Sequence, residues 1–114
     1  MIGTYAAGTT PRAIAFDGVH IWVANYDGQN VTRLNASDGS PAGSFSVGST
    51  PTAIAFDGTH VWVTSFHGHH VAKLRATDGA LLGTVVAGPQ PSGLVHDGAN
   101  IWVANDSSGT VSKL

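Results

Sequence analysis

The sequence predicts an all-β fold built from three copies of one unit of 40 residues. Trp22, Trp62 and Trp102 are spaced by that period. The same spacing separates the dipeptides near the start of each copy, which are Thr10-Pro11, Thr50-Pro51 and Gln90-Pro91. No long stretch shows the period of about 3.6 residues that marks an amphipathic helix. Self-similarity at a period of about 20–50 residues indicates a repeat architecture, so the three copies are expected to fold alike.

Each copy contains four segments with strand character. In the first copy, residues 12–16 are mainly apolar and lie between a proline and the Asp17-Gly18 turn, and residues 20–25 are rich in β-branched and aromatic side chains. Residues 31–34 and 42–47 each follow a further turn that contains glycine. Asp-Gly pairs suit hairpin turns, because Gly accepts positive φ and Asp bonds its own backbone. The pattern predicts four short strands in every copy.

Four short strands per 40 residues are typical of a β-propeller blade. The first two strands of each copy are almost continuously apolar, as expected for strands that pack on both faces. The tryptophans occupy one blade position, and we expect Trp22, Trp62 and Trp102 to fill the space between blades. The sequence therefore predicts a β-propeller of four-stranded antiparallel blades, with three blades per chain. The expected blades are residues 9–48, 49–88 and 89–114.

The sequence starts and stops inside a blade. Residues 1–8 align with the fourth strand of a copy, whereas the third copy ends on its third strand. We expect residues 1–8 of one chain to complete the third blade of another. The residues expected at this contact are Ile2, Tyr5, Val111 and Leu114. Propellers have about 4–8 blades, so a six-bladed homodimer is favoured over a nine-bladed homotrimer. The abrupt ends also suggest a trimmed or engineered piece of a longer propeller.

One motif carries a family resemblance. Residues 11–23 and 51–63 share Pro-x-Ala-Ile-Ala-Phe-Asp-Gly-x-His, a hydrophobic residue and Trp-Val, and Val-x-x-Leu and an Asp-Gly turn follow. This pattern resembles the repeats of YVTN/NHL-like propellers, in particular the virginiamycin B lyase-like group. The resemblance covers the whole chain and implies the propeller fold. In the lyase it would imply a metal-assisted elimination that uses His and Glu side chains, and this sequence contains no Glu.

Composition limits the classes of function. Charged residues make up 11% of the chain, and the formal net charge of −2 comes without a Lys/Arg run, so neither nucleic acid nor a membrane surface is an expected partner. The chain has no Cys, and no Walker or nucleophile-elbow motif is present. We therefore expect a protein without a cofactor that is not an enzyme.

The cellular compartment stays open on the sequence alone. Apolar stretches are strand-sized and fall far short of the roughly 20 residues that span a bilayer. The N-terminus has neither the basic nor the apolar region of a signal peptide, although a longer, bacterial and extracytoplasmic parent could have carried one. The expectation is a soluble chain.

The loops on one rim of the expected propeller differ between the copies, whereas the strand positions are kept. Loops on a rigid scaffold commonly carry binding function. The candidate ligand-binding residues on this rim are Arg12, Tyr26, Asp27, Phe66, His67, His69, His70 and Asp106.

His67, His69 and His70 are the sharpest local feature of that rim. Imidazoles two or three residues apart on a turn can chelate zinc, nickel or copper. A solvated loop without a metal is the alternative that we favour, so no metal is expected to be required.

Three functions remain open from the sequence. The favoured one is a self-assembling scaffold or interaction module, whose partner is a second copy of the chain and whose rim binds a small ligand, peptide or glycan. The alternatives are a metal-dependent lyase of the virginiamycin B lyase-like type and a lectin. The rim is rich in Trp, Tyr, Asn and Asp, which is the basis for the lectin alternative.

Overall fold

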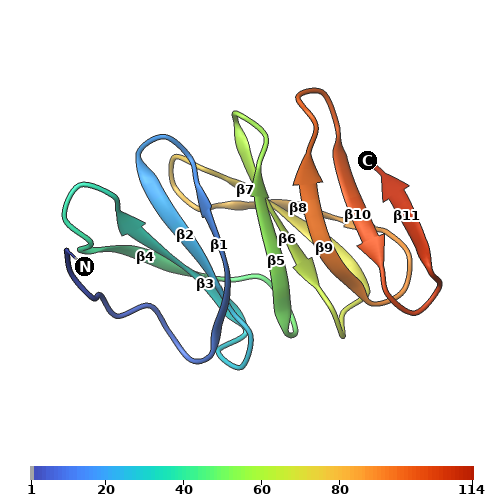
Figure 1. The fold of residues 1–114 in the computed structure, drawn as a ribbon, viewed down its shortest axis with the longest axis horizontal. Helices are drawn as coiled ribbons and strands as arrows, with labels where there is room; N and C mark the ends of the chain where they lie inside the picture. The colour runs from blue at the N-terminus through green and yellow to red at the C-terminus, as the bar shows by residue number, and fades with distance from the viewer. Residues whose placement is uncertain (1) are drawn as a thin grey trace.

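The computed structural model describes residues 2–114, which form β-strands and no helix. The first sheet consists of β1 (Pro11–Phe16), β2 (His20–Asn25), β3 (Asn30–Asn35) and β4 (Pro41–Ser46). The second consists of β5 (Pro51–Phe56), β6 (His60–Ser65), β7 (His70–Arg75) and β8 (Leu81–Val86). The third consists of β9 (Pro91–His96), β10 (Ile101–Asn105) and β11 (Thr110–Lys113). We call these sheets blades 1, 2 and 3 (Figure 1).

Every blade is an antiparallel meander in sequence order, which confirms the predicted fold class. In blade 1 the second strand matches the prediction residue for residue. The first strand begins at Pro11, the third extends over Asn30–Asn35, and the fourth covers Pro41–Ser46 instead of residues 42–47. Residues such as Asn30 close the turns through backbone pairing that apolarity alone does not reveal, as in the pair Asn25 and Asn30. No helix within residues 2–114 could cross a membrane.

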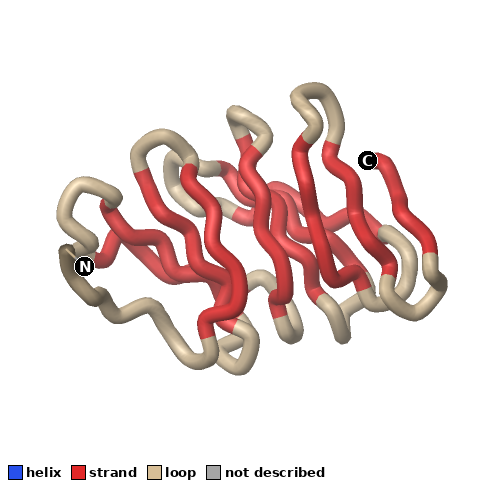
Figure 2. The backbone as a smooth tube through the Cα atoms, viewed as in Figure 1, coloured by secondary structure: helices blue, strands red, loops and turns tan. Residues whose placement is uncertain are grey.

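The three blades stand side by side along an arc (Figures 1 and 2). The first strands make the closest approach between blades: β1 contacts β5, and β5 contacts β9. The first strands therefore lie at the inner edge of the arc and the last strands at its outer edge. This wedge-like arrangement is the one that curves a row of blades toward a ring.

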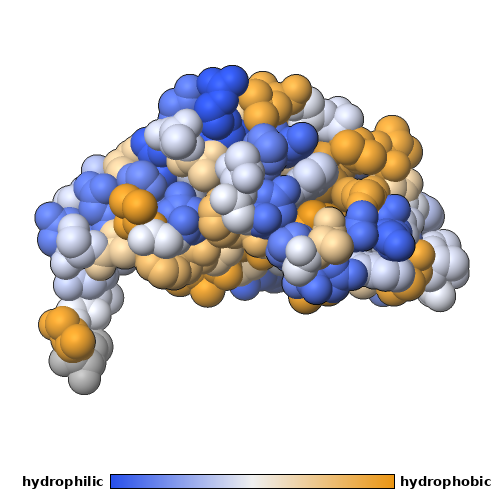
Figure 3. Space-filling view, turned by 90° about the horizontal axis from the view of Figure 1, so that it is seen from above, coloured by the Kyte–Doolittle hydropathy of each residue, from blue (hydrophilic) through white to orange (hydrophobic). Residues whose placement is uncertain are grey.

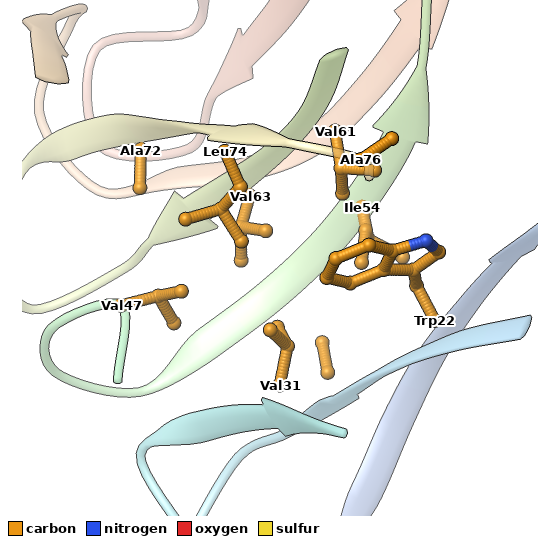
Figure 4. Close-up of a cluster of buried hydrophobic side chains, with 10 residues drawn as sticks. Trp22, Val31, Val47, Ile54, Val61, Val63, Ala72, Leu74 and Ala76 are labelled. Atoms are coloured by element: carbon orange, nitrogen blue, oxygen red, sulfur yellow. The ribbon is translucent and has the colours of Figure 1, made fainter. Parts of the chain in front are cut away.

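The core lies between the blades. Between blades 1 and 2, the fully buried Trp22 shares a cluster with Ile54, Val61 and Leu74 (Figure 4). Between blades 2 and 3, Trp62 packs against a smaller cluster that contains Ile101 and Val103, the equivalents of Val61 and Val63. Trp22 and Trp62 thus pack onto the following blade, and burial of such apolar surface is the main stabilising contribution to the fold.

An aspartate at the first turn of every blade fixes the tryptophan. The indole N–H donates to the carboxylate in Trp22–Asp17 at 2.9 Å, in Trp62–Asp57 at 2.8 Å and in Trp102–Asp97 at 2.7 Å. The hydrogen bonds from Trp102 and from the Asn100 and Ala99 backbone lower the pKa of Asp97 to about 2. Burial raises the pKa of Asp17, but its hydrogen bonds from Trp22, His20 and Val19 outweigh burial and leave the pKa below its usual value. The first Asp-Gly pair of each blade therefore acts both as a turn and as a tryptophan anchor.

Residues 2–8 form no strand in the single chain, and Met1 lies outside the described residues. The strand expected over residues 1–8 pairs with another chain and stays a prediction. A strand needs a neighbouring edge, and the edge predicted for this segment belongs to another chain. Instead the segment runs along the outward face of blade 1, where the Thr32 hydroxyl donates to the Ala7 carbonyl at 2.7 Å.

Candidate functional site

The outward face of blade 1 lacks the cover that blade 2 has. Ile14 is 69% exposed, whereas its equivalent Ile54 is 8% exposed beneath blade 1. Ala36 is likewise exposed and Ala76 buried. Because the same side chains occur at the same positions, the difference arises from the missing neighbour and not from the blade itself. Blade 1 therefore exposes a face whose counterpart on blade 2 is covered by the preceding blade.

Blade 3 presents the opposite face of a blade to solvent. Val111 is 66% exposed, although its equivalents Val31 and Val71 are completely buried. Val95 is 58% exposed on the same blade. In Figure 3, apolar surface gathers toward the right, the side on which blade 3 lies in Figure 1. The row of blades thus exposes two different apolar faces, one on blade 1 and one on blade 3. Each has a buried counterpart elsewhere in the chain.

An apolar cavity of about 580 Å³ lies on the face of blade 1. Its floor contains Ile14, Ile21, Val23 and Leu34, and its wall contains Ile2, Tyr5 and Ala7. The floor residues are equivalent to Ile54, Val61, Val63 and Leu74, which share a core cluster with Trp22. We call this cavity the blade 1 socket. Trp22 of blade 1 occupies the corresponding place on blade 2.

Residues 2–8 contact blade 1 as the fourth strand of a preceding blade would. Tyr5 is equivalent to Phe45, and its ring occupies the space in which a Cβ on Gly39 would lie. The Phe45 ring occupies the same space beside Gly79 of blade 2. Gly39 and Gly79 both have positive φ, 74° and 76°, so glycine is needed there for conformation as well as for space. The segment therefore lies where the fourth strand of a neighbouring blade belongs.

The edge strand β11 is unpaired on one side within the described residues, because blade 3 has the order β11-β10-β9. Its equivalents β3 and β7 pair with β4 and β8. Of the predicted contact residues, Val111 on β11 is exposed, whereas Leu114 packs into the cluster between blades 2 and 3.

The rim carries a repeated hydrogen bond between two loops. Thr10 donates to Asp27 at 2.5 Å in blade 1, Thr50 lies 2.8 Å from the Nδ1 atom of His67 in blade 2, and Ser107 donates to Gln90 in blade 3. Different side chains thus perform one role at equivalent positions. Asp27 and His67, which were predicted as ligand-binding residues, hold the loops together.

The imidazoles of the His-rich loop point to different partners. His69 accepts the Gln90 backbone N–H at 3.1 Å through Nδ1, and the Nδ1 atom of His70 lies 3.1 Å from the Gly68 carbonyl. His69 also has a left-handed φ of 57°, at the turn position that Gly109 occupies with a φ of 65° in blade 3. Among residues 2–114, no three His, Cys, Asp or Glu side chains form a group that could hold a metal ion. The loop has the geometry of a hydrogen-bonded turn.

We expect removal of metal to leave the fold intact. The three imidazoles engage different protein groups, so zinc or nickel should bind at micromolar affinity or weaker, and a chelator should not unfold the chain. The near-ultraviolet circular dichroism of the tryptophans, recorded with and without EDTA, measures this. A loss of that signal in EDTA would instead indicate a structural metal site.

Four other rim residues meet in one pocket of about 310 Å³. Arg12 and Tyr26 of blade 1, Phe66 of blade 2 and Asp106 of blade 3 line it together with Thr52 and Ser92. The Arg12 guanidinium lies 4.2 Å from the centre of the Tyr26 ring, within the range of a cation–π contact. The structure thus brings together part of the predicted rim set, on the inner side of the rim. We call this the rim pocket.

No protein-family model matches the sequence, and no curated protein matches it. Among solved structures, the chain is similar to hydrazine synthase from Kuenenia stuttgartiensis, with 25% identity and a TM-score of 0.79 over 92% of this chain and 32% of that one. It is similar to BamB from Moraxella catarrhalis, with 14% identity and a TM-score of 0.77 over 88% of this chain and 30% of that one. Both are β-propeller proteins. The chain has a β-propeller fold.

A third similar structure is that of U3-55K, with 14% identity and a TM-score of 0.66 over 90% of this chain and 35% of that one. The chain spans about a third of the length of each of these structures. The likeness therefore establishes the propeller fold.

The socket residues Ile14, Ile21, Val23 and Leu34 were not predicted as a site. A signal for them was present in the sequence, because the equivalent residues of the second copy are Ile54, Val61, Val63 and Leu74. Comparing the copies identifies the positions that face a neighbouring blade. It does not show which copy lacks that neighbour, since this depends on the order of blades in space.

Proposed function

We propose that the chain is a self-assembling β-propeller scaffold, in which two copies close a ring of six blades. The observation that carries this proposal is the blade 1 socket. At the equivalent place blade 2 holds Trp22 and blade 3 holds Trp62, each from the preceding blade. By the same geometry, Trp102 of a second copy is the side chain that fits the socket.

The proposed ring is sealed by residues 2–7. In blade 1, Val31 pairs with Phe45, and in blade 2, Val71 pairs with Val85. The corresponding pair is Val111 of one copy with Tyr5 of another. The position of Tyr5 over Gly39 supports this register, because it places the segment beside blade 1 as a fourth strand of the preceding blade.

The two contacting faces differ, so the contact is head-to-tail. Head-to-tail contacts form a closed ring when the rotation between copies closes and an open array when it does not. Propellers have about 4–8 blades, which favours two copies over three. An apolar interface of this kind resembles a divided protein core, so the two copies should be obligate partners.

The proposed scaffold acts by binding and without turnover. We further propose that its repeats belong to the YVTN/NHL-like type, in the virginiamycin B lyase-like group. This is supported by the motif at residues 11–23 and 51–63, in which Asp17 and Asp57 anchor Trp22 and Trp62. The lack of Glu supports a repeat that retains the propeller scaffold without the lyase chemistry.

We expect the particle in solution to have twice the chain mass of 11.6 kDa. Because each copy covers the apolar faces of the other, its thermal midpoint should rise with protein concentration. Light scattering coupled to size-exclusion chromatography measures the mass, and thermal unfolding at several concentrations measures the linkage. A particle of three chain masses would indicate a ring of nine blades in place of six. A monodisperse, folded single chain would overturn the proposal.

A further inference from the structure

The rim pocket contains a guanidinium without a hydrogen-bond partner. Arg33 donates to the carbonyls of Ala42, Ala76 and Thr77, and Arg75 donates to Asp78. Within residues 2–114, the Arg12 guanidinium forms neither a hydrogen bond nor an ion pair, and the Tyr26 ring is its only specific contact. The Arg12 donors are therefore free for another molecule.

The same pocket contains a carboxylate without a partner. Asp17, Asp57 and Asp97 accept tryptophan N–H groups, Asp38 and Asp78 accept hydrogen bonds inside their own turns, and Asp27 accepts one from Thr10. In the described part of the chain, no such bond reaches the Asp106 carboxylate. Arg12 and Asp106 also form no ion pair with each other, although both line one pocket.

The blades place these two charges apart. Arg12 comes from blade 1 and Asp106 from blade 3, and the pocket between them is lined by Thr52 and Phe66 of blade 2. Stacking on Tyr26 orients the guanidinium plane. A molecule that spans the pocket would therefore meet a cation at one end, a carboxylate at the other and an aromatic ring between them. The pocket volume of about 310 Å³ is at the lower end of the range for small-molecule sites.

The fold does not require these side chains. Two equivalent positions of each blade line the pocket. The first is Arg12, Thr52 or Ser92, and the second is Tyr26, Phe66 or Asp106. Because sister blades form with other residues there, the charges contribute little to the scaffold itself. Each can be replaced by the residue of a sister blade.

We propose that the rim pocket binds a small zwitterion whose carboxylate and ammonium groups are separated by a short apolar spacer. The carboxylate accepts hydrogen bonds from Arg12, the ammonium group donates to Asp106, and the spacer lies against Phe66. All of these residues belong to one chain, so the proposed site goes beyond the proposed assembly.

The test uses the full chain and a series of probes, namely γ-aminobutyrate, δ-aminovalerate and ε-aminocaproate. Caproate and pentylamine each carry one of the two charges and are the matched controls. Tryptophan and tyrosine fluorescence or calorimetry gives the affinities. We expect one zwitterion of the series to bind at least about tenfold more tightly than either control, since each charged hydrogen bond contributes roughly that factor.

Three variants test the assignment. Arg12→Thr carries the residue of blade 2, and we expect it to lower the affinity for the zwitterion about tenfold or more, to the level of pentylamine. Asp106→Asn should lower it to the level of caproate. Arg75→Asn removes the same charge as Arg12→Thr, carries the residue of blade 1 (Asn35) and should leave the affinity unchanged.

Failure of this proposal is distinct from failure of assembly. Sedimentation of the same samples reports the particle mass, which the ligand measurement does not use. The proposal is overturned if no member of the series binds at millimolar concentration, if the single-charge controls bind as tightly as the zwitterions, or if Arg75→Asn weakens binding as much as Arg12→Thr.

Discussion

A chain that lacks residues 1–8 should fail to assemble. The deletion removes the segment that would pair with β11 of the second copy, and with it the Tyr5 ring and the wall of the blade 1 socket. Each backbone hydrogen bond contributes about 0.5–1.5 kcal/mol net, and a strand of such bonds is lost at both junctions of a two-chain ring. We expect the dissociation constant to rise by more than about a hundredfold, or the chain to aggregate through its open edges. Analytical ultracentrifugation over a range of concentrations measures this.

The matched control for the deletion is a substitution at one position. Tyr5→Phe places the residue of the equivalent Phe45 over Gly39 and should assemble as the unmodified chain does. Tyr5→Asp puts a charge at the same place and should weaken assembly as the deletion does. If the chain without residues 1–8 assembles with unchanged mass and affinity, residues 2–7 do not seal the ring.

The repeat made the fold predictable. The period of 40 residues, the Asp-Gly turns and the aligned tryptophans were enough to predict four-stranded blades, because local turn chemistry and apolar patterning agree in each copy. Asp17 was predicted only as a turn residue, but its carboxylate also accepts a hydrogen bond from Trp22. This hydrogen bond depends on the direction in which the Trp22 side chain points, and the sequence alone does not give that direction.

The rim was harder to predict, because its loops differ in sequence while sharing one geometry. Asp27 and His67 are candidate ligand-binding residues by residue type, and in the structure each also forms the loop-to-loop bond that Ser107 forms in blade 3. Arg12 and Asp106 were in the same predicted set, and the structure distinguishes them by leaving both side chains without a hydrogen bond in residues 2–114. The residue type alone does not show whether a charged side chain has a hydrogen-bond partner inside the protein.

Trp102→Ala should separate the chain's fold from its assembly. In the single chain Trp102 is partly exposed, and the residues that its side chain contacts, Asp97 and Lys113, belong to its own blade. Removing it should therefore change the fold of one chain little. In the proposed ring it fills the socket, so the same change should cost about 3–5 kcal/mol at each junction. Trp62→Ala is the comparison, because Trp62 packs between blades of one chain and its loss should destabilise the chain at every concentration.

Mixing two defective chains tests the head-to-tail geometry directly. Ile14→Asp places a charge in the socket, whereas Trp102→Ala removes its occupant, so neither variant alone should form an intact junction. In a mixed pair, the unmodified Trp102 of the first variant meets the unmodified socket of the second, which restores one junction of the ring. We expect the mixture to sediment as a two-chain particle at a concentration where each variant alone is a single chain. If the mixture remains single chains while both variants stay folded, Trp102 and the socket are not partners.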